Sequence, residues 1–432
     1  MTIPLRQGTH DAHAGDTKQD DGHGERMGKL LLVTAVRLRN GPRGLQLDDQ
    51  TCAGICRWAE RFETVTFAGI LVTEDAEDAT STSWLDVADL PCSDQLRFVP
   101  LPLAYRVGQF LKSYKRMRAL LADEIRQADH MSFTVGYLVG DWAAVAALEA
   151  TSQRRKFAIW FDRVEQDVIR NGIPELPFRR QIKERLSLPI MIRYHRYLLG
   201  KSSLALLQGM DTFSVYAPHA SNPACVYDVH THPKDFIDKA TLAAKIDGIL
   251  RGEPLRICYV GRAAVMKGPL DWLHALAAAR SRGLSFQARW LGDGPLHAEM
   301  KELADKLGLS DVVALPGYVG DRDTILNAMR ESHLFMYCHK TKESPRCLIE
   351  ALVSGSPIVG YGGGYQEGLV AEHGGGAFSP VHDVAALAES LRRLDSDRLT
   401  LAALVRSAAE SGRQFDEATL YRQRSELIAT YS

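Results

Sequence analysis

The stretch HLFMYCHKTKESPRCLIEALVSGSPIVGYGGG, residues 333–364, carries two apolar runs separated by a helical pattern. The runs HLFMYC (333–338) and PIVGY (357–361) are short and continuously apolar, which is typical of strands buried on both faces. Between them, Ser344 is a good helix N-cap and Pro345 is a good first helical residue. A strand, a helix and a second strand in this order predict parallel strands in an α/β fold.

The same alternation extends outward over most of the chain. Further apolar runs, each expected to be a strand, are LLLVTAV (30–36), VTFAGILV (65–72), KFAIWF (156–161), RICYV (256–260), FQARWL (286–291) and VVALP (312–316). Helical patterns separate them, and a less regular region covers 218–236. The alternation predicts two doubly wound sheets, with a cleft between two domains of similar size.

The expected domain boundaries follow from these shifts in pattern. Residues 1–27 are polar and lack an apolar core, so they are expected to be a disordered tail and not a signal peptide. The first domain is expected over 28–235, a linker over 236–254 and the second domain over 255–414. A final helical stretch covers 415–432.

Composition excludes several classes of protein. The 432 residues carry 52 Lys and Arg against 53 Asp and Glu. This balance gives no basic field for nucleic acid. No run of 18 apolar residues predicts a transmembrane helix. The seven dispersed cysteines favour reduced, buried thiols and a cytoplasmic location, with Cys52 and Cys56 packed on one helix.

The first motif with chemical potential is VGRAAVMKGP, residues 260–269. The strand is expected to end at Gly261, and Pro269 suits the first position of the next helix. Arg262 and Lys267 would then lie in a loop at the carboxyl end of the sheet, beside a helix N-terminus, where they suit a diphosphate. Two solvated loop cations are an equally good interpretation of this motif alone.

The second motif is the helix start in KESPRCLIEA. The backbone N–H groups of Ser344, Arg346 and Cys347 are expected to be unpaired there and to form an anion site with the helix dipole behind them. Glu350 lies off the apolar stripe of this helix. Its carboxylate could accept hydrogen bonds from sugar hydroxyls such as a ribose diol. An exposed helix glutamate is the alternative interpretation.

Glycine-rich turns follow two of the expected strands. Gly292 and Gly294 in LGDGP, and Gly363 in a run of three glycines, stand at carboxyl ends of strands facing the same cleft. Glycine at such positions permits close approach of a ligand to the backbone. Ordinary flexible turns are the alternative.

Together these motifs resemble the C-terminal domain of the retaining glycosyltransferases of family 4, which have the two-domain GT-B architecture. The resemblance covers about 256–394. It implies that Arg262 and Lys267 bind a donor diphosphate and that Glu350 binds the nucleotide ribose. It further implies that Gly317-Tyr318-Val319 cradles the base and that the last helix, 415–432, packs back on the first domain.

One position departs from the family pattern. The family pattern has a pair of glutamates, the first of them eight positions before the second. The second corresponds to Glu350 here, and Lys342 occupies the position of the first. Glu343 is the nearest carboxylate. Either Glu343 contacts the donor hexose near the reacting carbon through a shifted loop, or the sugar contact is different. Glu343 is therefore one candidate catalytic residue.

The resemblance implies transfer of a hexosyl unit from a UDP- or GDP-linked sugar, with retention, to a saccharide or lipid-linked saccharide in polysaccharide or glycoconjugate synthesis. Arg262, Lys267 and the helix start near Ser344 would stabilise the leaving diphosphate without a metal or another cofactor. On the acceptor side, Asp162 is the candidate base, and His130 is another. A structural ion pair or helix cap is the alternative for each.

Two basic stretches with aromatic and leucine residues, 105–128 and 178–201, could rest on anionic lipid headgroups. The protein would then be cytoplasmic with peripheral contact to the inner membrane face. Solvated helix faces with core aromatics are the alternative. Two competing functions remain: a non-catalytic nucleotide-sugar-binding or scaffold protein, motivated by Lys342, and a GT-B sugar-nucleotide epimerase.

Overall fold

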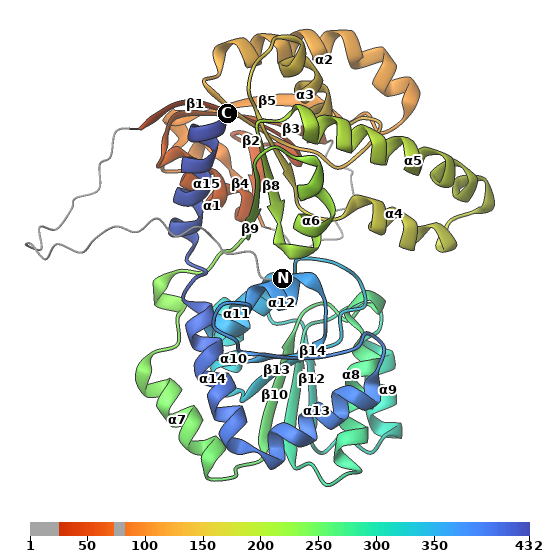
Figure 1. Cartoon of the computed structure of the whole chain (residues 1–432), viewed down its shortest axis with the longest axis vertical. Helices are drawn as coiled ribbons and strands as arrows, with labels where there is room; N and C mark the ends of the chain where they lie inside the picture. The colour runs from red at the N-terminus through yellow and green to blue at the C-terminus, as the bar shows by residue number, and fades with distance from the viewer. Residues whose placement is uncertain (1–25, 73–82) are drawn as a thin grey trace, which may run out of the picture.

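The computed structural model describes residues 26–72 and 83–432. Two α/β bodies lie one above the other, and the C-terminal helix returns to the upper, N-terminal body (Figure 1). Most of the predicted tail at 1–27 lies outside the described residues. Met27 already belongs to the first strand, so regular structure begins inside that predicted range.

Nine strands form the sheet of the upper body within the described residues. They are β1 (Met27–Gly41), β2 (Gly44–Asp48), β3 (Phe62–Val72), β4 (Trp84–Asp86), β5 (Leu96–Pro102), β6 (His130–Thr134), β7 (Ala158–Phe161), β8 (Leu204–Gln208) and β9 (Pro223–Val226). The parallel strands run in the order β5-β3-β1-β6-β7-β8-β9, and β2 and β4 extend the sheet as antiparallel strands.

The helices of this body are α1 (Asp49–Ala59), α2 (Val107–Gln127), α3 (Trp142–Ser152), α4 (Glu165–Gly172), α5 (Phe178–Lys201) and α6 (Gly209–Tyr216). Helix α3 is apolar around most of its circumference because it is buried in the core. The first half of α5 is different: it projects from the side of the body (Figure 1).

Six parallel strands form the lower sheet, in the order β12-β11-β10-β13-β14-β15. They are β10 (Leu255–Val260), β11 (Phe286–Leu291), β12 (Val313–Gly317), β13 (Leu334–Tyr337), β14 (Ile358–Tyr361) and β15 (Gly376–Ser379). This is the order of a dinucleotide-binding sheet, whose switch point lies between its first and fourth strands, here β10 and β13. The predicted α/β fold with two doubly wound sheets is confirmed.

Helices cover both faces of this lower sheet. They are α7 (Lys239–Leu250), α8 (Pro269–Arg280), α9 (His297–Lys306), α10 (Arg322–Glu331), α11 (Arg346–Val353), α12 (Gly364–Leu369), α13 (Val384–Ser396) and α14 (Arg398–Gly412). Helix α7 falls within the range 236–254, predicted as a linker, and packs against α14. We therefore assign α7 to the lower body.

The last helix, α15 (Glu417–Tyr431), packs against α1 of the upper body. Tyr421 lies edge-on to Trp58 of α1, with 5.1 Å between the ring centroids. Tyr421 and Ile428 belong to the same apolar cluster as the residues of α1 and β3. The chain thus crosses between the two bodies twice, before α7 and before α15, and these crossings fix the cleft.

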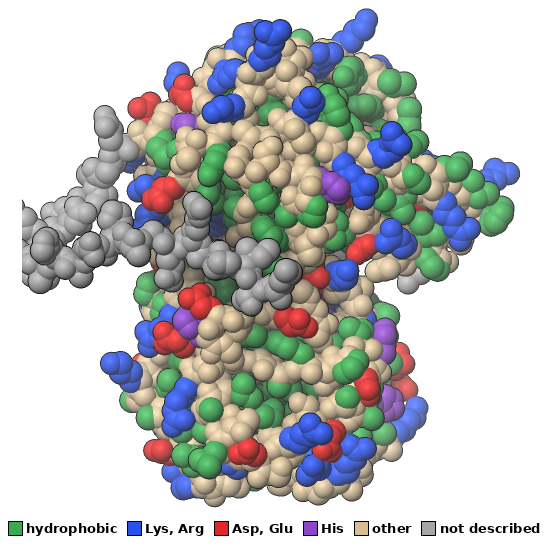
Figure 2. All heavy atoms as spheres, in the orientation of Figure 1, with side chains coloured by type: hydrophobic (Ala, Val, Ile, Leu, Met, Phe, Trp, Pro, Cys, Tyr) green, Lys and Arg blue, Asp and Glu red, His purple; other side chains and the backbone are tan. Residues whose placement is uncertain are grey.

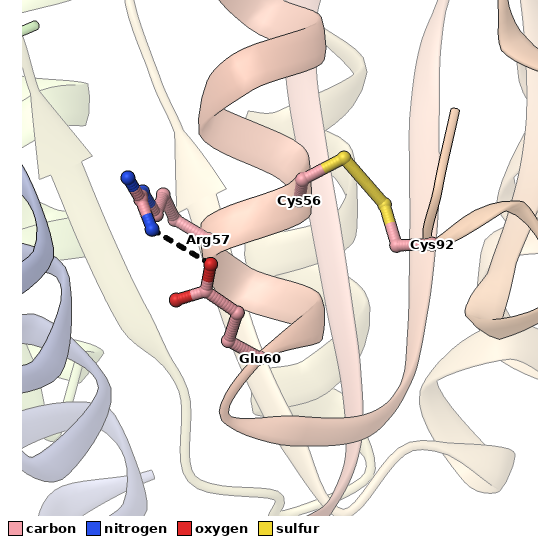
Figure 3. The surroundings of a disulfide bond; sticks show 4 residues. All are labelled: Cys56, Arg57, Glu60 and Cys92. Carbon is pink, nitrogen blue, oxygen red and sulfur yellow. Dashed lines mark hydrogen bonds and ion pairs between the residues drawn. A yellow bond between two sulfur atoms is a disulfide. The ribbon is translucent and has the colours of Figure 1, made fainter. Parts of the chain in front are cut away.

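The cysteines differ from the sequence-based expectation. Cys56 of α1 forms a disulfide with Cys92, which lies in the turn before β5, and their Cα atoms are 5.8 Å apart (Figure 3). Cys52 stays a free, buried thiol. The expectation that Cys56 is a reduced, packed thiol is therefore wrong. The partner is 36 positions away, and only the packing of the β4–β5 turn on α1 brings it close.

Among the described helices, none combines the length and the apolar character that crossing a membrane requires.

Candidate active site

The carboxyl ends of β10 and β13 bring two of the predicted residues into contact. Lys267, in the loop after β10, donates a hydrogen bond from Nζ to Glu343 Oε2 at 2.7 Å. Glu343 follows β13, and its Oε1 accepts from the Thr341 hydroxyl at 3.1 Å. Both charged side chains are mostly buried. The switch point of the lower sheet therefore holds a cation and a carboxylate that share one site.

Local backbone geometry explains the position of Lys267. The next residue, Gly268, has φ +62°. A Cβ atom there would lie 2.2 Å from the carbonyl oxygen of Cys338 at the end of β13. Only glycine fits this left-handed, close-packed position. It presses the loop after β10 against the end of β13, so Lys267 reaches across to Glu343.

Arg262 lies on the same loop but is exposed, and the described structure shows no hydrogen bond or ion pair to its guanidinium. The structure thus brings Lys267, and not Arg262, into direct contact with Glu343. Arg262 lies in the loop at the carboxyl end of β10, where its exposed side chain is available to an anion.

The predicted start of the third motif's helix is shifted. Helix α11 begins at Arg346, and its N-cap is Pro345, which has extended dihedrals (φ −74°, ψ 118°) and no capping side chain. The expectation that Ser344 caps this helix is wrong. Its hydroxyl instead donates to the backbone oxygen of Gln208 at 3.5 Å. Ser344 is bound to the opposite domain because it lies at the cleft.

Arg346 and Cys347, the first two residues of α11, carry N–H groups that the helix itself cannot pair. The Arg346 guanidinium donates to Gln50 Oε1 of α1 at 2.5 Å, so this side chain also spans the cleft. Burial raises the pKa of the Cys347 thiol to about 12, which keeps it uncharged at neutral pH. Cys347 can therefore stand beside an anion without repelling it.

Glu350 is not a simple exposed helix glutamate. Its Oε1 accepts from Arg322 Nη1 at 2.7 Å, and its side chain is mostly buried. Arg322 is the first residue of α10. Sequence reasoning did not identify Arg322 because nothing in the local pattern at 321–324 shows that α10 starts beside α11.

The glycines of LGDGP have a different role from the predicted one. A Cβ at Gly292 would lie 2.0 Å from the carbonyl oxygen of Gly261, and one at Gly294 would lie 2.6 Å from that of Ala263. The close approach predicted for a ligand is made with the protein's own loop after β10. Gly363 instead lines a pocket of about 370 Å³, together with Lys342.

The segment predicted to hold the base follows β12 at the same edge of the sheet. Gly317 has φ +86°, and its carbonyl accepts from the N–H of Gly292 at 2.8 Å. Tyr318 is exposed and Val319 is half-buried. These residues follow β12, which lies two strands away from β10 and the switch point.

Between the two bodies lies a cleft of about 450 Å³ that both line. Asp162 and Arg163, which follow β7, face Glu343, Ser344 and Arg346 across it. Several aromatic or charged residues that sequence reasoning missed also line the cleft: Trp58, Phe67, Trp160, Asp228, Tyr421 and Arg424. Tyr421 and Arg424 reach the cleft because α15 returns to the upper body, and the other four come from α1, β3, β7 and the segment after β9.

His130, the other acceptor-side candidate, does not lie at the cleft edge. It begins β6, so it stands at the amino end of a parallel strand, opposite the carboxyl ends that bind ligands. Its Nδ1 lies 3.3 Å from the backbone oxygen of Ser432. The prediction that His130 is a catalytic base is wrong.

Lys342, at the position where the family pattern has a glutamate, points to the upper body. Its Nζ lies 3.4 Å from Asp167 Oδ2 of α4. Lys342 and Asp167 both line the pocket beside Gly363. The lysine that replaces the family's glutamate therefore forms an ion pair between the two domains.

Known proteins resemble both this geometry and the motifs. Residues 244–414 match the family model described as glycosyl transferases group 1. Residues 244–414 form a group 1 glycosyltransferase domain. The group 1 domain thus contains Lys267, Glu343 and Glu350, and the family expected from the motifs is confirmed.

Two relatives illustrate the likeness of sequence. The putative colanic acid biosynthesis glycosyltransferase WcaL of Salmonella typhimurium is 26% identical over 188 residues, which are 41% of this chain and 46% of that protein. The 2-deoxystreptamine glucosyltransferase of Streptomyces kanamyceticus is 25% identical over 235 residues, which are 52% of this chain and 60% of that protein. The chain thus spans about half the length of the curated relatives it matches.

Solved structures extend the likeness of fold beyond the group 1 domain to nearly the whole chain. Anabaena HepE in complex with UDP superposes with a TM-score of 0.61 at 15% identity, covering 94% of this chain and all of that one. The lipopolysaccharide outer core galactosyltransferase WaaB gives a TM-score of 0.62 at 12% identity, covering 94% and 99%. The chain has the GT-B fold.

Proposed function

We propose that the chain transfers a hexosyl unit, with retention, from a nucleoside diphosphate sugar to a saccharide or lipid-linked saccharide in polysaccharide or glycoconjugate synthesis. The contact of Lys267 with Glu343 at the switch point carries this proposal. A diphosphate beside Lys267 would place the donor hexose near Glu343. The group 1 domain and the complex of HepE with UDP support a nucleotide donor and favour UDP over GDP.

The chemistry follows from where charge develops. As the bond from the hexose to the diphosphate breaks, negative charge grows on the leaving oxygen. Lys267, Arg262 and the N–H groups of Arg346 and Cys347 are the groups available to stabilise that charge. Metal independence remains a prediction. Because Lys267 already pairs with Glu343, the cation is held in place before the donor arrives.

On the acceptor side, we propose that Asp162 contacts the attacking hydroxyl. Asp162 is exposed in the cleft that Glu343 also lines. Its neighbour Arg163 is engaged by Glu165, with Nε at 2.7 Å from Oε2, so the arginine does not neutralise Asp162 by a direct contact. A carboxylate with a free oxygen can accept the proton or hydrogen bond of a hydroxyl.

A panel of nucleotide sugars tests the proposal. The purified protein should hydrolyse or transfer from at least one UDP- or GDP-linked hexose, and the matching nucleotide diphosphate should raise its melting temperature. No turnover and no thermal shift with any member would remove the enzyme proposal. Binding without turnover over a broad set of acceptors would favour the scaffold alternative, which the Lys342–Asp167 pair motivates.

We also propose that the projecting half of α5 contacts a membrane surface. The helix carries seven Lys or Arg and one acidic residue. Phe178 and Leu186 are 73% and 69% exposed, and Ile182 and Ile190 share their spacing of four. Apolar and basic side chains gather on this projection (Figure 2). A basic helix with an exposed apolar stripe suits anionic lipid, which would hold a lipid-linked acceptor within reach.

Replacing Phe178 and Leu186 together with serine is expected to reduce binding to anionic phosphatidylglycerol vesicles by at least about tenfold, since each buried apolar side chain contributes roughly 1.5–3 kcal/mol. Cosedimentation measures the bound fraction. Leu399→Ser is the matched control, because Leu399 of α14 is 75% exposed on the lower body. Equal binding of the double variant and the control would contradict the contact.

A further inference from the structure

The guanidinium of Arg322 joins Glu350, the residue predicted to bind the ribose, to the segment that connects the two domains. Arg322 Nη1 donates to Glu350 Oε1 at 2.7 Å. Its Nη2 donates to the backbone oxygen of His230 at 3.0 Å and lies 3.2 Å from Asp235 Oδ2. His230 and Asp235 belong to the crossing between β9 and α7. Arg322 therefore contacts both α11, which carries Glu350, and the first crossing between the two bodies.

The same crossing is bound to the second one. His230 Nδ1 lies 3.1 Å from Oε1 of Glu417, the first residue of α15. Glu417 Oε2 accepts from Arg57 Nε of α1 at 2.8 Å. Burial raises the pKa of Glu417, but the bonds from His230 and Arg57 outweigh it and hold the pKa at about 2. The buried carboxylate is thus a permanent anion at the junction.

These contacts form one polar chain through both crossings: Glu350, Arg322, His230, Glu417 and Arg57. It begins on α11 in the lower body and ends on α1 in the upper body. Charge-assisted hydrogen bonds are strong and directional, so displacement of one member shifts its neighbour. The carboxylate of Glu350 is consequently placed by the crossing segment as well as by its own helix.

The geometry at Glu350 suits a diol. Arg322 donates to Oε1, and among the described residues none donates a hydrogen bond to Oε2. A carboxylate with one oxygen fixed by a cation can present the other to a hydroxyl in a single orientation. Without Arg322, the side chain of Glu350 would be free to rotate.

We propose that Arg322 is a positioning residue: it orients Glu350 toward the ribose hydroxyls of the donor and links ribose recognition to the interdomain crossing. The proposal rests on the proposed function, because it needs a nucleotide donor. It goes beyond that function by assigning the discrimination of ribose from deoxyribose to a residue that does not touch the nucleotide.

Isothermal titration with UDP and with 2′-deoxy-UDP tests the positioning. Wild-type protein should bind UDP about tenfold more tightly, the value expected for a hydrogen bond to a charged group. Arg322→Gln should lose most of that preference, with UDP weakened toward the affinity of 2′-deoxy-UDP and the deoxynucleotide little changed. Arg322→Lys, which keeps a cation, should restore part of the preference.

The matched control is Arg330→Gln. Arg330 lies on the same helix and donates to the backbone oxygen of Asp235 at 2.8 Å, but it does not contact Glu350. It should leave the preference intact. Equal weakening of both nucleotides by Arg322→Gln would mean a structural role and would overturn the positioning.

The crossing link has its own variant. Glu417→Gln removes the charge between His230 and Arg57. It should reduce the ratio of the affinities for UDP and 2′-deoxy-UDP by at least about threefold. An unchanged preference in this variant would overturn the link to the crossing. A wild-type protein that binds UDP but does not distinguish it from 2′-deoxy-UDP would overturn the inference alone. A wild-type protein that binds no nucleotide diphosphate would overturn the proposed function and this inference together.

Discussion

Lys267→Ala is expected to lower kcat for hexosyl transfer by about 10²–10³-fold, the usual cost of removing one group that stabilises developing negative charge. Lys267 is mostly buried and is held by Glu343 at 2.7 Å, so its ammonium is already positioned at the switch point. Under the proposed function, the variant loses the cation nearest the leaving diphosphate. It also leaves the carboxylate of Glu343 without its partner.

Steady-state kinetics with the best donor of the panel measure this loss, and isothermal titration with the matching nucleotide diphosphate shows whether binding falls as well. Lys306→Ala is the control, because Lys306 lies exposed on α9 at the same domain's surface. Far-ultraviolet circular dichroism should show that both variants are folded. A Lys267→Ala enzyme with near wild-type kcat and nucleotide affinity would remove the phosphate assignment.

Lys245→Ala should lower the free energy of unfolding by roughly 2–6 kcal/mol, because two buried backbone oxygens lose their hydrogen-bond donor at about 1–3 kcal/mol each. Lys245 is buried in α7. Its Nζ lies 3.0 Å from the backbone oxygens of Ser354 and Gly355, 3.4 Å from that of Met329 and 3.2 Å from Ser356 Oγ. It thus pairs the backbone oxygens of Ser354 and Gly355, which directly follow α11, and adds to the bonds that Met329 O of α10 already accepts from Ser332 N and Ser356 Oγ.

Urea unfolding measures the difference, and Lys239→Ala is the control, because Lys239 is an exposed residue at the start of the same helix. An unchanged midpoint and slope for Lys245→Ala would show that the carbonyl groups find other partners. Because α11 carries Glu350, the variant should also weaken nucleotide binding.

The stability of the wild-type protein should depend on pH through the same residue. Burial lowers the pKa of Lys245 from 10.5 to about 7 in the folded protein. Between these values the unfolded chain binds more protons, so stability rises with pH, by at most about 1.4 kcal/mol per unit. Lys245→Ala should lack this rise between pH 7 and 9. A rise of the same size in the variant would assign it to another group.

The strands and long helices could be predicted where the local pattern of apolar residues alone defines the element. The boundaries of β11 and α5 agree with the predicted ranges 286–291 and 178–201. By contrast, β9 (Pro223–Val226) lies in a region that looked irregular, because it is a short edge strand whose neighbours and not its composition define it. The two-sheet fold could therefore be predicted, but the width of the first sheet could not.

The site shows the same division. The contact of Lys267 with Glu343 follows from strand order, since both residues come after strands that adjoin at the switch point. The N-cap at Pro345, and the pairing of Cys56 with Cys92, depend on packing between distant segments. His130 failed as a candidate because β6, the strand that it begins, was not among the predicted strands, so its place at the amino end of the sheet was not seen.

The two sheets share a strand order, and this bears on how such a chain can diversify in evolution. Apart from β9 and the antiparallel strands β2 and β4, β5-β3-β1-β6-β7-β8 and β12-β11-β10-β13-β14-β15 have the same rank order, and their carboxyl edges face one cleft. The described chain passes between the bodies only before α7 and before α15. Recombination at these two points could exchange the upper body, together with its α15 contacts, while the lower one is retained. Under the proposed function, acceptor choice and donor choice would then be inherited separately, and a chimera cut at both crossings would reproduce this exchange in the laboratory.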